Sequence, residues 1–203
     1  YKIQEGSRTR IKTIEFEGNA AFTPRELKKH IETKTAIWIL RAGAFDKDRA
    51  ETDVGRLRNF YRDEGFLDAQ VGYRSEAGAD ATSLKVVFVI EEGTRYKIEE
   101  IRFRGNAVFS AEELTALMRS RAGSVVRQPD LDADVRTFQV RYGELGYLYA
   151  TVRAVRVFSD TPGLVNVTIE INEGDQFRVG RVVVRGNSRT QDKVVRRALN
   201  LYP

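Results

Sequence analysis

The chain has 203 residues, of which 41% are hydrophobic and 31% are charged, with a formal net charge of +5. This composition is enough for folded cores and excludes a disordered acidic or basic tail. The absence of cysteine excludes disulfides and thiolate chemistry, and a single histidine leaves few routes to a zinc site. No apolar run approaches the ~20 residues of a membrane span, so we expect a soluble protein or the soluble part of a longer one.

A strand is the first element that the sequence predicts, at residues 11–17. Ile14 and Phe16 alternate there with polar residues, which is typical of a half-buried strand. The Gly-Asn pair that follows predicts a turn, because glycine takes a positive φ at little cost. A short helix is expected next, since Thr23 and Glu26 have the spacing of a capping box, which Ser110 and Glu113 repeat later in the chain.

A second, longer helix is predicted at about residues 48–64, where Leu57 and Tyr61 share one face. Two strands close the unit, at residues 67–73 and 84–90. The order β-α-α-β-β predicts an α+β fold, in which two helices cover one face of a three-stranded mixed sheet. We expect the first strand to pair with the last, which leaves the second strand as a free edge.

The unit recurs along the chain. Three markers repeat in one order: a strand followed by Gly-Asn, a helix ending in Tyr-x-x-x-Gly, and a Glu-Gly pair. They lie at 11–19, 98–106 and 179–187; at 61–65 and 142–146; and at 5–6, 92–93 and 173–174. Such repetition indicates tandem domains. The predicted segments are the tail of a preceding repeat (1–7), a repeat with a longer inter-helix loop (8–93), a second repeat (94–175) and the start of a further, truncated repeat (176–203).

These motifs resemble a known family. The strand with Gly-Asn, the helix end Phe-Tyr-Arg-Asp-Glu-Gly-Phe-Leu-Asp-Ala at 60–69 and the closing Ile-x-Glu-Gly are similar to those of POTRA domains. The resemblance covers essentially the whole chain and is strongest to the middle and later repeats of BamA-like proteins, which assemble outer-membrane β-barrels. The middle repeat of that family has a longer, tryptophan-containing segment between its helices, and Trp38 lies in six extra residues at that place.

The resemblance implies a periplasmic location, as the soluble part of an outer-membrane protein, with an organellar outer membrane as the alternative. It also implies a downstream β-barrel in the same chain. The partners that it implies are unfolded outer-membrane proteins and accessory assembly lipoproteins. No enzymatic activity and no cofactor are implied.

Catalytic and metal-binding residues are not indicated by the sequence. His30 lies within the predicted first helix without a serine or cysteine motif, so we expect a structural histidine on the surface or half-buried. Paired carboxylates such as Asp46 and Asp48 lie at helix ends, where acids ordinarily cap the helix or interact with its dipole. We therefore expect no catalytic residue and no metal site.

The second strand of each repeat is the first candidate binding surface. A free edge accepts another extended chain through backbone hydrogen bonds, with little preference for sequence. The alternative is an edge blunted by the charges around it, which include Arg74, Glu76, Arg153 and Arg156. The predicted client-binding residues are Leu67, Ala69, Val71, Tyr73, Leu148, Ala150 and Val152.

Two further surfaces are candidates for contact with a membrane or a partner. The first is the apolar run Ile37, Trp38, Ile39 and Leu40. This run either covers the core of its own repeat or forms an exposed loop that contacts lipid headgroups or another protein.

The second is the basic C-terminal stretch, because residues 176–203 have seven basic residues against one acidic residue and the rest of the chain is nearly neutral. It is a solvated face of an incomplete domain or a contact for anionic lipid headgroups. Nucleic acid is disfavoured, because the Gly-x-x-Gly clamp of KH domains is absent between the helices. The candidate contacts are Arg181, Arg185, Arg189, Arg196 and Arg197.

Together these features predict a non-enzymatic module that guides unfolded outer-membrane proteins by edge-strand addition and docks accessory subunits. The alternative is a membrane-surface docking or scaffold module of a related import or secretion channel. Salt distinguishes the two, since headgroup binding weakens with ionic strength whereas backbone pairing persists.

Overall fold

The computed structural model describes residues 10–35, 45–78, 83–178, 180 and 194. In the first repeat the elements are β1 (Arg10–Glu17), α1 (Pro24–Leu27), the 3-10 turn η1 (Lys28–His30), α2 (Lys47–Asp63), β2 (Gln70–Ala77) and β3 (Ser83–Glu91). In the second they are β4 (Lys97–Arg104), α3 (Ala111–Leu117), α4 (Gln128–Glu144), β5 (Thr151–Phe158) and β6 (Leu164–Asn172).

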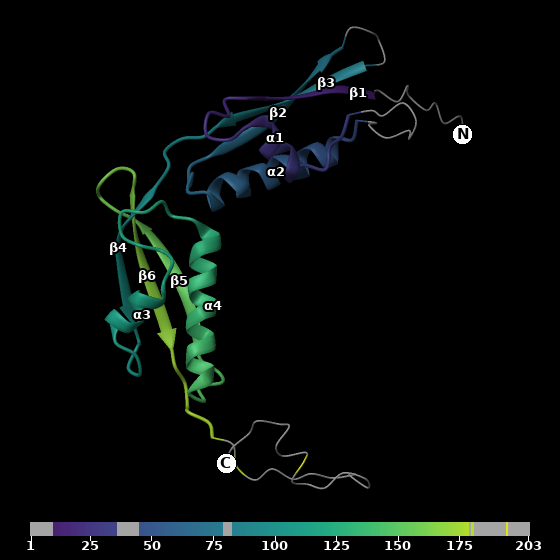
Figure 1. The fold of residues 1–203 in the computed structure, drawn as a ribbon. Helices are drawn as coiled ribbons and strands as arrows, with labels where there is room; N and C mark the ends of the chain where they lie inside the picture. Colours follow the sequence, from purple (N-terminus) through teal and green to yellow (C-terminus); the bar gives the residue numbers. More distant parts are fainter. Residues whose placement is uncertain (1–9, 36–44, 79–82, 179, 181–193, 195–203) are drawn as a thin grey trace, which may run out of the picture. The chain divides into compact units, whose positions relative to one another are not determined.

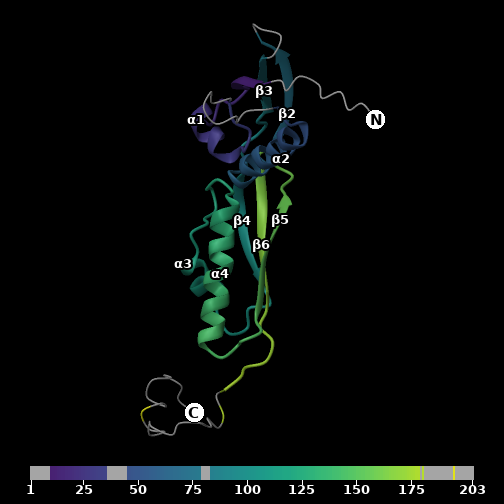
Figure 2. The same ribbon diagram turned by 90° about the vertical axis from the view of Figure 1, so that its right-hand side faces the viewer.

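Each repeat contains one three-stranded sheet, with the strand orders β1-β3-β2 and β4-β6-β5 (Figure 1). β1 is parallel to β3, and β2 is antiparallel to β3. In the second repeat, helices α3 and α4 lie on one side of the strands (Figure 2). The predicted α+β class, the pairing of first with last strand and the edge position of the second strand are confirmed.

The core of each repeat lies between the sheet and its helices, and the predicted apolar stripes supply it. In the first repeat Leu27, Leu57 and Tyr61 are fully buried against the sheet residues Val86 and Phe88. The second repeat repeats this arrangement with side chains that are all buried. They are Leu114, Leu131, Phe138, Tyr142, Val167 and Ile169.

Both capping boxes form as the sequence predicts. Thr23 Oγ1 accepts a hydrogen bond from the backbone N–H of Glu26, and the Glu26 carboxylate accepts one from the backbone N–H of Thr23. Ser110 and Glu113 make the same reciprocal pair at the start of α3. The first helix is nevertheless short, because α1 gives way after Leu27 to the 3-10 turn that contains His30.

The edge strands begin later than predicted. Leu67 and Ala69 precede β2 in a turn, where the Ala69 N–H donates to the carbonyl of Phe66. In the same way Leu148 and Ala150 precede β5. β2 continues beyond Tyr73 to Ala77, so the predicted strand boundary is wrong at both ends.

The three repeat markers meet in one place in each domain. In the first repeat, Glu92 of the Glu-Gly pair at 92–93 accepts hydrogen bonds from the Tyr61 hydroxyl at 3.0 Å and from the Ala21 N–H, just after the Gly-Asn turn, at 2.8 Å. Glu173 accepts from the Tyr142 hydroxyl at 2.9 Å and from Ala107 N–H at 2.7 Å. The markers therefore form a hydrogen-bonded cluster, the polar lock. It connects the turn after the first strand, the end of the second helix and the end of the last strand of each repeat.

The buried tyrosines of this lock predict a loss of stability at alkaline pH. Burial raises the pKa of the Tyr61 and Tyr142 hydroxyls well above 10, and their carboxylate partners raise it further. Above pH ~10 the unfolded chain loses these protons while the folded chain keeps them, so the free energy of unfolding falls by about 1.4 kcal/mol per pH unit for each tyrosine. Urea unfolding between pH 8 and pH 12 measures this slope.

Replacing Tyr142 by phenylalanine removes one of these two contributions, so we expect a shallower slope for that variant. Tyr149→Phe is the control for the loss of a phenol, because Tyr149 is 73% exposed. An unchanged slope in Tyr142→Phe contradicts the assignment of the alkaline transition to the lock.

Candidate functional site

The free edge of β2 presents the backbone groups of its odd-numbered residues. The Gly78 N–H donates to the carbonyl of Ser83 at 2.9 Å, so Gly78 faces β3. Because backbone N–H and C=O groups alternate in direction along a strand, the even-numbered residues face β3 too. The outward groups belong to Val71, Tyr73, Ser75 and Ala77.

β5 repeats this geometry. The Ser159 N–H donates to the carbonyl of Leu164 at 3.0 Å, and Ser159 takes the place of Gly78 when Tyr142 is aligned with Tyr61. The outward backbone groups are therefore those of Val152, Ala154, Arg156 and Phe158. The Val152 side chain is buried, as is that of Val71, so at these positions the edge offers its backbone rather than a side chain.

Each sheet also has a second edge, at β1 and β4, which the sequence reasoning missed. The start of β4 is already paired: the Ile98 N–H donates to Ser124 O at 2.8 Å, and the Gly123 N–H donates to Ile98 O at 2.7 Å. The residues that correspond in sequence to this segment, among 36–44, lie outside the described residues. We take β2 and β5, the strands that the sequence predicts as free edges, as the candidate edges.

A charged network covers the outer face of the first sheet. The Arg74 guanidinium binds both oxygens of Glu17, at 2.6 and 2.9 Å, and one oxygen of Glu76 at 2.9 Å. Lys85 bridges Glu15 and Glu76. Hydrogen bonding to Arg74 lowers the pKa of both Glu17 and Glu76. These charges pair with one another over the outer face, both within β2, where Arg74 binds Glu76, and from β2 to β1, where Arg74 binds Glu17.

The second sheet has fewer charges at the equivalent places. Arg153 Nε donates to Glu170 at 2.6 Å, and the outer-face positions that follow on β5 are Val155 and Val157. Val157 is 58% exposed. The outer face of β5 is therefore apolar at Val155 and Val157, where that of β2 is ionic.

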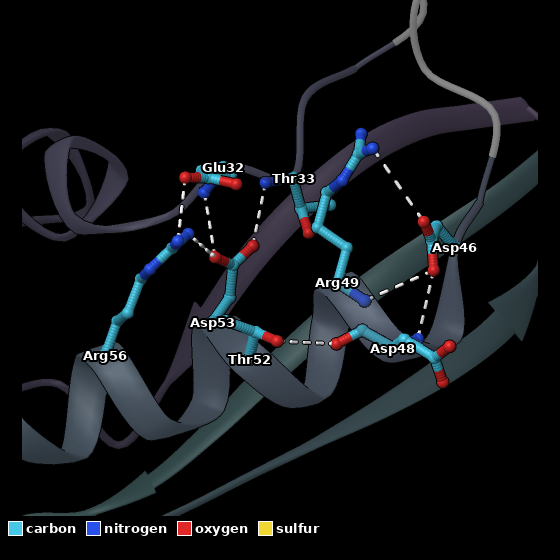
Figure 3. A network of polar contacts seen from close by, with 8 residues as sticks. All are labelled: Glu32, Thr33, Asp46, Asp48, Arg49, Thr52, Asp53 and Arg56. Atoms are coloured by element: carbon cyan, nitrogen blue, oxygen red, sulfur yellow. Dashed lines mark hydrogen bonds and ion pairs between the residues drawn. The ribbon is translucent and has the colours of Figure 1, made fainter.

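A buried carboxylate organises the start of α2 (Figure 3). Asp53 is fully buried and accepts hydrogen bonds from the backbone N–H groups of Glu32 at 2.8 Å and Thr33 at 2.7 Å. Arg56 Nη1 donates to Asp53 at 3.0 Å and Arg56 Nη2 donates to Glu32 at 2.7 Å. Asp53 thus anchors the backbone at 32–33 to the helix, which is a structural role.

Of the two carboxylates that the sequence places at the start of α2, Asp46 caps the helix and Asp48 lies in its first turn. Asp46 accepts from the backbone N–H groups of Asp48 at 3.0 Å and Arg49 at 3.2 Å.

His30 is half-buried and its ring stacks on Phe60, with centroids 4.0 Å apart. Burial lowers the pKa of His30. This places His30 in a packing contact beside a cleft of about 480 Å³ that Lys29, Glu32 and Asp63 also line.

Clusters of metal ligands and helices that could span a membrane are both absent from the part of the chain that the structure describes. That part has no group of three or more His, Asp or Glu side chains placed to hold a metal ion. None of its helices has the length and apolarity that a membrane span requires.

The remaining predicted contacts lie outside the described residues. They are the run Ile37 to Leu40 and the arginines at 181, 185, 189, 196 and 197. The binding roles assigned to them stay predictions, as do the client-binding roles of the edge strands.

Comparison with known proteins matches the two repeats to one family. The family model described as "POTRA: Surface antigen variable number repeat" matches residues 9–93 and 96–174. The outer membrane protein assembly factor BamA of Neisseria meningitidis is 27% identical over 97% of this chain, and that of Neorickettsia risticii is 28% identical over 98%. The chain spans about a quarter of the length of these curated relatives.

Solved structures agree on the fold. The crystal structure of Haemophilus influenzae BamA POTRA3-5 aligns with a TM-score of 0.58 at 23% identity, covering 93% of this chain and 76% of that one. Haemophilus ducreyi BamA lacking POTRA domains 1-3 aligns with a TM-score of 0.55 at 19% identity, covering 80% of this chain and 29% of that one.

Proposed function

The chain belongs to the POTRA family, and we propose that it is a non-enzymatic periplasmic module that guides unfolded outer-membrane β-barrel proteins towards membrane insertion. Its similarity to outer membrane protein assembly factors supports this proposal. The substrates are then extended segments that have not yet formed a barrel. Accessory assembly lipoproteins are further partners in this proposal.

The observation that carries the mechanism is the pair of edge strands with outward backbone groups. β2 and β5 each have eight residues, and alternate residues in each present an N–H and a C=O away from the sheet. A strand of an outer-membrane barrel has roughly 10 residues, so its length matches such an edge. Addition of that strand satisfies backbone groups on both sides and demands little of its side chains.

A membrane-docking function is the second candidate, and the segregation of charge favours it. Seven basic residues and one acidic residue fall within residues 176–203. Each basic residue close to an anionic surface contributes about 1 kcal/mol of attraction, which salt screens. In this case the apolar run Ile37 to Leu40 would contact the headgroup region together with the arginines.

The test is an amide NMR titration of the 203-residue chain with a synthetic peptide of about 10 residues from an outer-membrane strand. We expect shifts and slowed hydrogen exchange at outward amides, such as Tyr73 or Ala154, that persist in high salt. Backbone pairing requires this result, because the outward N–H groups become donors to the peptide.

The control is the same peptide with N-methyl groups on alternate residues. N-methylation of the residues that face the chain removes their donors and is expected to abolish binding, whereas methylation of the other set is tolerated. Shifts that vanish in high salt, or amides that respond only to anionic vesicles, reject edge pairing and support membrane docking.

A further inference from the structure

The two free edges differ in what lies beside them. We propose that the β5 edge of the second repeat receives the client segment, while Arg58 holds the β2 edge of the first repeat closed. The client segment is an amphipathic strand whose apolar side chains lie towards Val155 and Val157. This inference rests on the proposed function. It specifies which repeat binds the client segment and which pattern of side chains in that segment the repeat selects.

The first edge is capped from its own helix. Arg58 Nη2 on α2 donates to the carbonyl oxygen of Val71 at 3.3 Å. Val71 is the first outward-facing residue of β2, so this bond occupies an acceptor that an added strand needs. Arg62 follows one turn later on the same flank of the helix. An incoming strand must therefore displace an arginine side chain before it can pair.

The second edge lacks this cap. When Tyr142 is aligned with Tyr61, Gln139 stands where the first repeat has Arg58, and Gly143 stands where it has Arg62. Among the described residues, no α4 side chain donates to an outward carbonyl of β5. A methyl group at Gly143 would meet no atom within 4 Å, so the helix flank beside β5 has free space.

The surroundings of β5 also suit an amphipathic strand. Val155 and Val157 stand on its outer face where β2 has Arg74 and Glu76. On the other side of the edge, the flank of α4 offers the polar amide of Gln139. A strand of a membrane barrel alternates apolar and polar side chains. Its apolar side chains would lie beside Val155 and Val157, and its polar side chains would lie beside Gln139.

A hollow lies over the start of this edge. Its volume is about 390 Å³, and it is within the second repeat. The residues that line it are Thr151, Val152, Arg153, Glu170, Ile171 and Asn172. It gives room for a side chain of the added strand beside the first outward backbone group of β5.

The test exchanges the two helix residues. The probe is a peptide of about 10 residues that alternates valine and threonine. In the unaltered chain we expect shifts at the β5 amides of Val152 and Ala154. Gln139→Arg is expected to weaken this binding about tenfold, because it adds a competing donor to the Val152 carbonyl. Arg58→Gln is expected to create new shifts at Val71 and Tyr73.

Val140→Arg is the matched control. Val140 neighbours Gln139 on α4 and is also exposed, but it points about 100° further round the helix. Arginine there therefore adds the same charge away from the edge. It is expected to leave peptide binding within about twofold of the original. Amide spectra of all variants without peptide check that the second repeat stays folded.

The outcomes separate the inference from the proposed function. Binding at β2 in the unaltered chain, with no effect of Gln139→Arg, overturns the inference and leaves edge pairing intact. Equal losses in Gln139→Arg and Val140→Arg overturn it as well, because charge alone then explains the effect. If the peptide pairs with neither edge in any variant, the proposed mechanism and the inference both fall.

Discussion

Replacing Gly105 by alanine is expected to lower the free energy of unfolding of the second repeat by about 4 kcal/mol. Gly105 has a φ of +81°, in the left-handed region that costs a residue with a Cβ about 1–2 kcal/mol. A Cβ at this position would also overlap the backbone carbonyl oxygen of Ile171. Because that carbonyl belongs to β6, relief of the overlap must move the strand away from the turn. Urea unfolding followed by circular dichroism measures the loss, and hydrogen exchange assigns it to residues 96–174.

Gly123 provides a matched control for this substitution. Its φ is +82°, yet a Cβ there would meet no atom within 4 Å. Gly123→Ala is therefore expected to cost only the backbone strain, about 1–2 kcal/mol. Equal losses in Gly105→Ala and Gly123→Ala would show that the close approach of Ile171 contributes nothing.

Much of the fold follows from local sequence signals. The capping boxes at Thr23 and Ser110 require only residues three apart, and the structure forms both. The alternation of apolar and polar residues in the strands, and the apolar faces of the helices, likewise indicate a two-layer fold. Each apolar face must pack against another to be buried. The strand ends were less predictable: alternation at Ala69 and Val71 suggested a strand, but the Phe66–Ala69 turn delays β2 until Gln70.

The site depends on contacts that local patterns do not reveal. Arg58 lies 13 residues from its acceptor Val71, and Asp53 lies 20 residues or more from the N–H groups that it binds. A signal for the first contact was nonetheless present. Alignment of the two repeats on their Tyr-x-x-x-Gly markers places Gln139 against Arg58, and this difference falls beside the predicted edge.

Residues that the repeats share and residues in which they differ therefore have different roles. The shared Tyr-Glu pairs and the glycine after each first strand build the polar lock and the strand turn. The differing residues, Arg58 against Gln139 and Arg74 against Val155, surround the free edges. Under the proposed function, these differences give the two edges different access for an added strand.

Removal of the Asp53 carboxylate is the second substitution with a large expected effect. Asp53→Ala leaves the backbone N–H groups of Glu32 and Thr33 without their acceptor, in a place where Asp53 itself is fully buried. Each buried donor left unsatisfied costs about 1–3 kcal/mol, and Arg56 loses an ion-pair partner. We expect the free energy of unfolding of the first repeat to fall by about 3 kcal/mol, measured by urea unfolding with hydrogen exchange over residues 10–93.

Two comparisons identify the cause of that loss. Asp46→Ala removes an exposed helix cap from the same helix and is expected to cost about 1 kcal/mol. Arg56→Ala tests the ion pair alone: Arg56 is 38% exposed on its side chain, so its loss is expected to cost no more than about 1 kcal/mol. If Arg56→Ala were as damaging as Asp53→Ala, the ion pair rather than the anchoring of the 32–33 backbone would be the stabilising contact. If hydrogen exchange instead accelerates first at Glu32 and Thr33 in Asp53→Ala, the carboxylate holds that backbone on α2 directly.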